Sequence, residues 1–254
     1  IESENIGSDK YRADVVSVAG STNKRLDHVR QALDLGPKLI FLEKPLASSL
    51  DDGLKILDLC DAAHVKLAVN YLRRWDRETL LLKECLTTNS FGVFLGATAQ
   101  CTRGLINNGS HVIDLWRLLF GEINLVSADL GQSTLIDDNH GCLTFVPSYV
   151  DVPLTLTVFD ADYSFLRVDF YFSGGSISMF DGGRNWFFYQ TCEDNRFTGF
   201  KKLADVETRV GTLDECMMAA LSNIVSSVKH DEPIASTGHS AYETSKLIFR
   251  AYEL

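Results

Sequence analysis

A short apolar segment that runs into a charged turn and a helix start constrains this fold more than any other stretch of the chain. Residues 39–42 read Leu-Ile-Phe-Leu, which has the length and composition of a buried strand. Glu43, Lys44 and Pro45 form the turn, and two serines shortly after it can cap a helix. Proline biases the residue before it toward extended backbone, so we expect Lys44 to lie extended at the carboxyl end of the strand. Ligands of open parallel sheets bind outside that end, which makes Lys44 a candidate binding residue.

Strands and helices alternate through the first part of the chain. Strands are predicted at residues 13–19, 39–42 and 65–69, and helices at residues 24–35 and 50–64. Short strands that alternate with helices form right-handed βαβ units, so this part predicts a doubly wound parallel sheet of the Rossmann type. No Gly-x-Gly-x-x-Gly follows a strand anywhere in the sequence. The pattern therefore corresponds to the half of such a domain that lacks the pyrophosphate-binding loop.

The composition is that of an ordinary globular protein, and it narrows the choice of partners. Of 254 residues 45% are hydrophobic, and 24 Lys and Arg stand against 34 Asp and Glu, a net charge of -10. This balance argues against nucleic acid and anionic membrane as the main partner, and plain solubility is the simpler explanation of the charge. No apolar run approaches the ~20 residues that span a bilayer, and no Cys-x-x-Cys pair indicates a zinc site or a disulfide framework. We expect a cytoplasmic protein with reduced thiols.

The sequence changes character at residues 70–77, where arginines and aromatic residues crowd together. We expect this stretch to join a partial dinucleotide-binding domain at residues 1–72 to an α+β domain at residues 73–254. Arg73 and Arg74 are adjacent and project to different sides of a helix or strand, so at most one of them is expected to face a ligand. An ordinary ion-paired arginine is an equal alternative for each.

The second domain is predicted to be mainly strand after an initial helix at residues 78–88. Strands are predicted at residues 93–102, 124–130, 142–146, 152–159, 165–172, 176–180 and 186–190. They imply a large, mainly antiparallel open sheet with flanking helices. An open sheet needs its second face covered, which predicts a homo-oligomer formed through that sheet. The aromatic run at residues 186–189 is the candidate interface strand, with core packing as the alternative.

A loop rich in Gly and Asn leads into a strongly amphipathic helix at residues 110–120. Ser110 is placed to cap the start of this helix. His111 and Asp114, three residues apart, share a face of its first turn. A histidine with an unperturbed pKa of about 6.5 can accept a proton near neutral pH, although capping or core filling is the alternative for His111. A metal site is not predicted, because further ligands at suitable spacing are lacking.

Two of these stretches resemble the Gfo/Idh/MocA family of NAD(P)-dependent sugar and polyol oxidoreductases. One is the Glu-Lys-Pro turn at residues 43–45, between a short apolar strand and a capped helix. The other is the helix start at residues 107–114, which is similar to the family's Asp-x-Gly-x-His-x-x-Asp motif but has Asn107 at the first acidic position. The resemblance covers nearly the whole chain and implies that Ile1 lies inside the nucleotide-binding domain, whose first half is missing.

The resemblance implies an NAD or NADP cofactor bound by residues that follow the strands of the first domain. The expected contacts are Ser21, Thr22, Asn23, Glu43, Lys44, Pro45 and Asn70. In the family the turn at residues 21–23 passes near the nicotinamide ribose, and Asn70 lies at the end of the strand beside the nicotinamide. Helix capping is the alternative for residues 21–23, and a surface ion pair is the alternative for Lys44. A histidine that the family places near position 26 is absent, since His28 lies two positions further on.

The resemblance also implies the reaction, which is hydride transfer between the nicotinamide and a carbon of a sugar or polyol. Lys44 would orient and polarise the reacting oxygen, and His111 would carry its proton. Other substrate hydroxyls would be held by Asn107, Asp114 and one of Arg73 or Arg74. Because an amide cannot hold a proton, Asn107 leaves His111 less strongly activated than a carboxylate would. This departure from the motif argues against carrying over an inositol or glucose specificity directly.

A function of a different class is the alternative. Without the backbone amides of a glycine loop the pyrophosphate has no cradle, which favours a truncated, cofactor-free remnant that binds a sugar or serves as a dimerising module. A hydrolase or a metal enzyme is not predicted, because the sequence has no Gly-x-Ser-x-Gly turn and no cluster of metal ligands.

Overall fold

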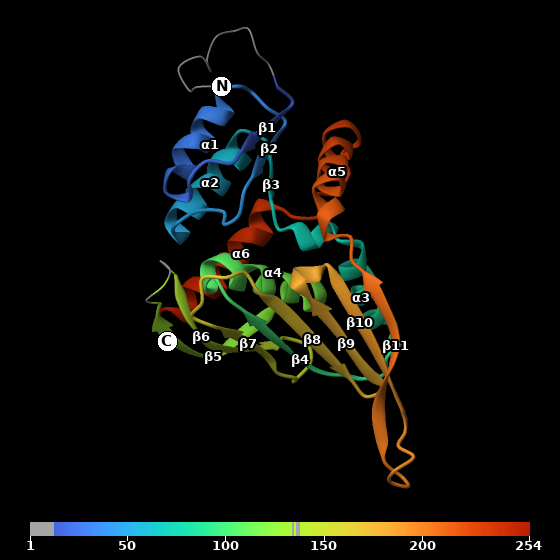
Figure 1. The fold of residues 1–254 in the computed structure, drawn as a ribbon. Helices are drawn as coiled ribbons and strands as arrows, with labels where there is room; N and C mark the ends of the chain where they lie inside the picture. The colour runs from blue at the N-terminus through green and yellow to red at the C-terminus, as the bar shows by residue number, and fades with distance from the viewer. Residues whose placement is uncertain (1–12, 134, 136–137) are drawn as a thin grey trace. The chain divides into compact units, whose positions relative to one another are not determined.

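The computed structural model describes residues 13–133, 135 and 138–254, which divide into two compact units (Figure 1). Among the described residues, the first unit consists of those up to residue 71 together with residues 218–249, and the second of those from 72 to 217 together with residues 250–254. The expected division placed everything after residue 72 in the second domain. Residues 218–249 depart from it, because they belong to the first unit.

A three-stranded parallel sheet forms the centre of the first unit. Its strands β1 (Val15–Val18), β2 (Leu39–Leu42) and β3 (Lys66–Val69) lie in the order β1-β2-β3. The helices α1 (Arg25–Leu33) and α2 (Leu50–Ala62) connect them and lie on the same side of the sheet (Figure 1). All four residues of β2 are buried. The predicted alternation of strands and helices in a parallel sheet is confirmed.

Local side-chain chemistry starts α2 directly after the charged turn. Ser49 is the N-cap, and its hydroxyl oxygen accepts a hydrogen bond of 3.1 Å from the backbone N–H of Asp52. Asp51 and Asp52 lie in the first turn, where carboxylates interact favourably with the positive end of the helix dipole. Ile56 and Cys60 belong to the buried face that packs into the core of the unit.

The C-terminal segment joins the first unit by pairing with β3. Ser236 donates a hydrogen bond of 2.6 Å from its hydroxyl to the carbonyl of Val69, and Thr237 forms an antiparallel bridge with Ala68. The Nζ of Lys66 donates to the carbonyl of Ser227 at 2.8 Å. These bonds satisfy backbone and side-chain groups of β3, and they are the physical reason why residues 218–249 depart from the expected division.

An eight-stranded mixed sheet dominates the second unit. Its strands are β4 (Phe94–Cys101), β5 (Ile123–Gln132), β6 (Asn139–Pro147), β7 (Leu154–Val158), β8 (Leu166–Phe172), β9 (Gly175–Phe180), β10 (Asn185–Glu193) and β11 (Lys201–Val210). They lie in the order β11-β10-β9-β8-β4-β7-β6-β5. The pair β4 and β7 runs parallel, and the other neighbours run antiparallel. The predicted large, mainly antiparallel sheet is confirmed.

Helices cover one face of this sheet and leave the other open. The helix α4 (Ser110–Phe120) lies across it (Figure 1), with Trp116 in an edge contact to Phe145 at 5.8 Å between ring centroids. Side chains alternate along β10, so that Trp186 and Phe188 are buried while Phe187 and Tyr189 are only half-buried. The run predicted as an interface strand therefore contributes to both the core and the second face, and pairing between subunits stays a prediction.

Two local features of the second unit differ from the expectations. The strand β11 was not predicted, because its sequence carries Lys, Asp, Glu and Arg, as an edge strand paired on one side commonly does. Ser110 does not cap α4, since a π-helix (Gly104–Gly109) runs directly into this helix and Gly109 already has helical angles. The Ser110 hydroxyl instead donates to the carbonyl of Asn107 at 2.8 Å.

The described residues contain no helix that is both long enough and apolar enough to cross a membrane.

Asp76 connects the start of α3 (Arg77–Thr88) to the segment that follows β11. It is fully buried, and its Oδ2 accepts from the backbone N–H and the hydroxyl of Thr79 at 2.9 and 2.7 Å. Its Oδ1 accepts from the hydroxyl of Thr212 at 2.8 Å. This carboxylate therefore caps a helix and also satisfies the hydroxyls of the buried Thr79 and the half-buried Thr212.

We expect Asp76→Ala to lower the free energy of unfolding by about 2 kcal/mol or more. The lost N-cap costs roughly 0.5–2 kcal/mol, and leaving the buried Thr79 hydroxyl without a partner adds to that loss. Urea unfolding followed by circular dichroism measures this loss. Ser49→Ala, which removes a cap with a single bond, is the control at about 1 kcal/mol. A loss for Asp76→Ala no greater than for Ser49→Ala contradicts the assigned role.

Candidate functional site

The carboxyl ends of the three parallel strands meet in register. Val18 pairs with Leu42, and Leu42 pairs with Val69, so the last residues of β1, β2 and β3 form one row across the sheet. Glu43 follows directly after β2, and Asn70 directly after β3. The residues that were predicted to contact a cofactor after β2 and β3 therefore come together at the edge where ligands of parallel sheets bind.

Glu43 and Asn70 are held against each other at this edge. The Glu43 backbone N–H donates to the carbonyl of Val18 at 3.1 Å, and that of Asn70 donates to the carbonyl of Leu42 at 2.8 Å. The side-chain amide of Asn70 donates to Oε1 of Glu43 at 2.8 Å. Asn70 is buried, and its Oδ1 finds no donor within the described part of the chain. That oxygen remains an acceptor that a bound amide could use.

Arg25 completes this group and was missed by the sequence analysis. Its Nη1 donates to the carbonyl of Val18 at 3.0 Å, and the side chain is buried. Burial lowers the pKa of the Arg25 guanidinium, and the nearby carboxylate of Glu43 acts in the opposite direction. Glu43 thus interacts with both Arg25 and Asn70. The sequence carried a signal, because Arg25 precedes the buried Val29 by four residues and so shares the inward face of α1.

The other expected cofactor contacts are placed at the same turns but are more open. Lys44 and Pro45 are half-buried and joined by a cis peptide bond. Ser21 precedes a short 3-10 helix (Thr22–Lys24) and is exposed, as is Asn23. The Ser21 side chain makes no capping hydrogen bond, so helix capping does not explain its presence.

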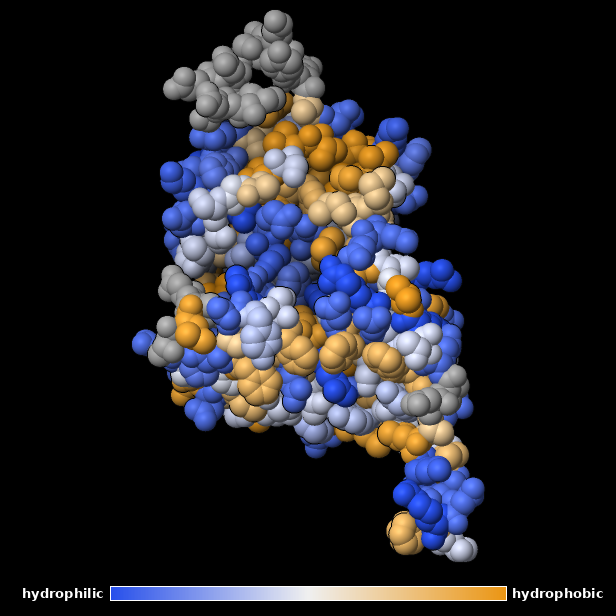
Figure 2. Space-filling model, in the orientation of Figure 1, coloured by the Kyte–Doolittle hydropathy of each residue, from blue (hydrophilic) through white to orange (hydrophobic). Residues whose placement is uncertain are grey.

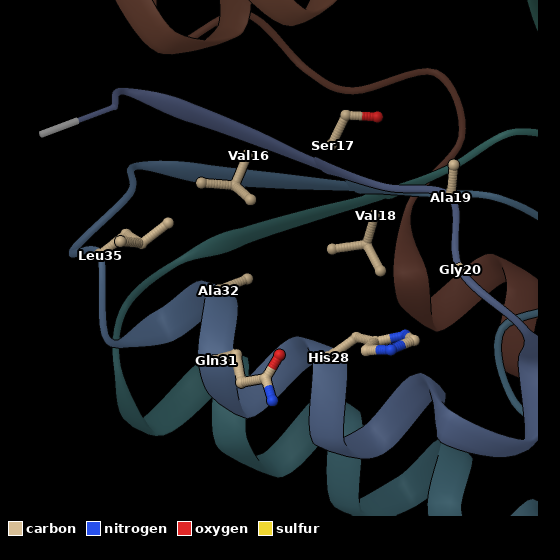
Figure 3. Close-up of a pocket in the computed structure, with 9 residues that line it drawn as sticks. All are labelled: Val16, Ser17, Val18, Ala19, Gly20, His28, Gln31, Ala32 and Leu35. Atoms are coloured by element: carbon tan, nitrogen blue, oxygen red, sulfur yellow. The ribbon is translucent and has the colours of Figure 1, made fainter. Parts of the chain in front are cut away.

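A cavity of about 230 Å³ runs along β1 to its carboxyl end. Val16 and Val18 point into it from β1, and His28 and Ala32 line it from α1 (Figure 3). The His28 ring lies against Gly20, where a Cβ would come 2.4 Å from its Cε1. Figure 2 shows an apolar area over this part of the first unit. Within the described ranges β1 pairs with β2 alone, so the cavity lies at an open edge of the sheet.

A second cavity, of about 170 Å³, lies wholly within the second unit. Arg73 reaches it from a 3-10 helix (Leu72–Trp75), and Asn108 and His111 reach it from the end of the π-helix and the start of α4. The predicted Asn107 is exposed and does not line the cavity, whereas its neighbour Asn108 does. His111 therefore lies at a cavity that could hold a small molecule, but the amide beside it is that of Asn108 and not that of Asn107.

Arg74 and Asp114 form a buried ion pair instead of lining this cavity. Their side chains are 9% and 1% exposed, and Nε and Nη2 of Arg74 donate to the two carboxylate oxygens of Asp114 at 2.8–3.1 Å. Of the two adjacent arginines, Arg73 thus faces the cavity and Arg74 is ion-paired. The predicted substrate contacts Asp114 and Arg74 are thus paired with each other, and neither lines this cavity.

Asp138 fixes the loop that carries Asn107 and was also missed. Its carboxylate accepts from the backbone N–H groups of Ile106 and Asn107 at 3.0 and 2.9 Å. Burial raises the pKa of Tyr252, and Asp138 adds to that shift by its charge and a hydrogen bond. No local pattern reveals this contact, because Asp138 lies far along the chain from the loop it caps. No three His, Cys, Asp or Glu side chains of the described residues gather as metal ligands.

Comparison with known proteins gives a consistent result. Residues 2–71 match the model of a family described as GFO_IDH_MocA, an oxidoreductase family with an NAD-binding Rossmann fold. An oxidoreductase from Schizosaccharomyces pombe is 27% identical over 135 residues, which are 46% of this chain and 36% of that protein. The aligned part thus spans about a third of the length of this curated relative. The family model that matches residues 2–71 is the family that the motifs predicted.

Solved structures with low sequence identity share the fold. A protein from Desulfitobacterium hafniense, described as an NADPH-dependent oxidoreductase, has a TM-score of 0.78 at 14% identity, and the match covers 95% of this chain and 77% of that one. An oxidoreductase from Agrobacterium radiobacter, in complex with NAD+, L-tartaric acid and magnesium, has a TM-score of 0.72 at 16% identity, covering 94% and 77%. The likeness extends over both units of the chain.

We expect Asp114→Ala to lower the free energy of unfolding by about 3–5 kcal/mol, because it leaves the Arg74 guanidinium buried without its carboxylate. Denaturant unfolding of the purified chain measures the change. Glu243→Gln, which breaks the half-exposed pair of Glu243 with Lys246 at 2.9 Å, is the control and should change stability by less than about 1 kcal/mol. Equal effects of the two substitutions are incompatible with a structural ion pair at Asp114.

Proposed function

We propose that this chain is a member of the Gfo/Idh/MocA family of oxidoreductases, whose model matches residues 2–71, and that it transfers a hydride between a nicotinamide cofactor and a sugar, a polyol or a sugar derivative. The observation that carries the proposal is the in-register row of strand ends, where Glu43, which interacts with Arg25, accepts a hydrogen bond from Asn70 next to the turn that contains Lys44. The reacting carbon would be a secondary alcohol in one direction and a carbonyl in the other.

The residues at the strand ends fit a nicotinamide. The Oδ1 of Asn70 is buried and has no donor among the described residues, and the carboxamide N–H of a nicotinamide is a donor of the kind it lacks. Glu43 accepts a hydrogen bond from the side-chain N–H of Asn70, which orients the amide so that its Oδ1 points away from Glu43. The family is NAD-binding, and the two solved relatives bind NAD+ or are described as NADPH-dependent. We propose NAD or NADP as the cofactor.

A bound nicotinamide accepts or donates the hydride, and the chain supplies the rest. In the oxidation direction a C–H hydrogen leaves the substrate as a hydride with both bonding electrons, and the hydroxyl proton must go to a base. His111 takes this proton in our proposal, because an imidazole titrates near neutral pH. Lys44 donates a hydrogen bond to the reacting oxygen, which orients it and favours the negative charge that develops there. Asn108 is available in the cavity to hold another hydroxyl.

We further propose that a second copy of the chain covers the open face of the eight-stranded sheet. Phe187 and Tyr189 are half-buried there, next to Arg167 and the partly exposed Phe180. A face with aromatic side chains and an arginine has the composition that protein interfaces favour. The six cysteines are free thiols, which supports the cytoplasm as the compartment.

Calorimetric titration of the 254-residue chain with NAD+ and NADP+ tests the cofactor proposal. We expect one of them to bind, and Asn70→Ala to weaken that binding about tenfold, because it removes a hydrogen-bond acceptor matched to the carboxamide. Asn124→Ala, at an exposed amide in the second unit, is the control. If neither cofactor binds, the chain is not a dehydrogenase by itself, and a cofactor-free sugar-binding or dimerising module becomes the better description.

Steady-state oxidation of a panel of sugars and polyols tests the catalytic roles. Lys44→Met and His111→Asn should each lower kcat about 100-fold or more, because a positioned general acid or base contributes roughly 100- to 10,000-fold. His230→Asn, at an exposed position near the end of α5 (Cys216–His230), should leave kcat unchanged. A His111→Asn enzyme that keeps both its kcat and its pH profile rules out His111 as the proton carrier.

A further inference from the structure

The cavity beside His111 contains a buried positive charge that the proposed reaction does not explain. Arg73 is 7% exposed, and its Nη2 donates to the carbonyl of Gly182 at 2.5 Å. Its Nε is buried and finds no acceptor in the part of the chain that the structure describes. No carboxylate of a described residue forms an ion pair with it, although the charges of Asp76 and Asp114 act on it through space.

The neighbouring arginine shows what Arg73 lacks. Arg74 is equally buried, and Asp114 neutralises it with a bidentate ion pair. Burial lowers the pKa of Arg73 to about 10, so this guanidinium still carries its charge at neutral pH. A buried charge is costly unless it is paired and hydrogen-bonded. The two adjacent arginines of this short helix therefore differ. The charge of Arg74 is neutralised by a carboxylate, whereas the charge of Arg73, on the cavity side, is not.

The other charged side chains of the cavity wall are already paired among themselves. Arg184 lies 4.0 Å from Asp181 and donates to Asp214 at 2.9–3.0 Å. Both carboxylates therefore interact with Arg184 and not with Arg73. An uncharged ligand would leave the cavity with the unmatched charge of Arg73.

The backbone beside Arg73 is shaped to receive it. Asp181, Gly182 and Gly183 have φ values of 47°, 66° and 115°, all in the region that favours glycine. A Cβ on Gly182 would come within 3.1 Å of the Arg73 Nη2, so a larger residue would press on the guanidinium. Positive φ at a residue other than glycine, as at Asp181, is uncommon and tends to occur at functional sites. This turn offers Arg73 a neutral carbonyl in place of an anion.

We propose that the cavity beside His111 binds a substrate that carries a carboxylate, and that Arg73 is the residue that recognises it. The proposal rests on the proposed function and names its substrate class: a small hydroxy acid or the acid form of a sugar, rather than a neutral polyol. The planar guanidinium offers donors in the geometry that matches a carboxylate, and such charge-assisted bonds are stronger than those to a hydroxyl. The hydroxyl that is oxidised would belong to the same molecule and lie next to His111.

The size of the cavity agrees with this class. At about 170 Å³ it is smaller than the roughly 300–1,000 Å³ of sites for drug-sized ligands, so it takes a small acid or one end of a longer one. Phe165 and Leu166 contribute apolar wall, which strengthens an interaction between a guanidinium and a carboxylate by excluding water.

Matched pairs of acids and polyols test the proposal without any turnover. Calorimetric titration of the 254-residue chain compares D-gluconate with D-glucitol and D-glycerate with glycerol, both with and without NADH. Each pair differs in one terminal group, a carboxylate against a hydroxymethyl. We expect at least one acid to bind about tenfold or more tightly than its polyol, because a hydrogen bond to a charged group contributes roughly 1.5–3 kcal/mol.

Three variants locate the contact. Arg73→Gln should remove the preference for the acid, and Arg73→Lys should restore part of it by returning the charge without the planar fork. Arg184→Gln is the matched control, since it removes an arginine of the same wall that is already paired, and should keep the preference. Circular dichroism reports whether Arg73→Gln folds, and the comparison of acid with polyol on the unaltered chain decides the proposal if it does not.

Equal affinity for acid and polyol, or no binding of either acid in both conditions, overturns the carboxylate proposal. So does an acid preference that survives Arg73→Gln or that disappears in Arg184→Gln. Oxidation of neutral polyols without an acid preference would leave the hydride-transfer function standing and remove only this inference. Acid binding by a chain that binds no nicotinamide cofactor would retain the site and remove the proposed function.

Discussion

The buried ion pair between Arg74 and Asp114 is the interaction on which the second unit of this protein depends. It joins the short helix that begins the second unit to the second turn of α4, and both charges are almost completely removed from water. A pair of this kind tolerates little displacement, because either partner alone would be a buried, uncompensated charge. Arg73 is adjacent to one partner, and His111 lies one helical turn before the other. The same pair that stabilises the unit therefore fixes the two side chains that face its cavity.

The first unit depends on a different constraint, the register of its parallel strands. Because the strand ends form one row, the residues that follow them must share an edge of the sheet. Glu43 uses this arrangement by interacting with Arg25 on one side and accepting from Asn70 on the other. Its contribution is to hold Asn70 in one orientation, which leaves the Asn70 carbonyl oxygen for a ligand. The carboxylate of this turn therefore has a structural role that the sequence analysis, which put Lys44 first, did not predict.

The parts of this fold that were predicted correctly are those with strong local signals. The buried strand β2 and its serine-capped helix follow from four apolar residues, a proline and a serine within one short stretch. A large, mainly antiparallel sheet was expected from short β-rich runs divided by turn residues, but β11 was not, because an edge strand with charged side chains looks like a loop in sequence. Ser110 has the side chain of a helix cap, yet the helix is continued backward through a π-helix that Asp138 holds from a distant part of the chain. Arg73 and Arg74 are adjacent in sequence, and only the tertiary structure distinguishes them. Arg74 is ion-paired with Asp114, whereas Arg73 faces the cavity.

The sequence by itself determined the alternation of strands and helices, the Glu-Lys-Pro turn and the histidine at the start of α4, and these motifs indicated the family whose model matches residues 2–71. These features depend on residues close together along the chain, where periodicity, capping and proline stereochemistry act directly. The tertiary structure decided that residues 218–249 belong with the first unit, that Arg25 and Asp138 support the two candidate sites, and that Arg73 is left without a carboxylate of its own among the described residues. Each of these depends on contacts between segments far apart in sequence. Burial and charge pairing at such contacts are set by the folded environment, which local composition does not encode.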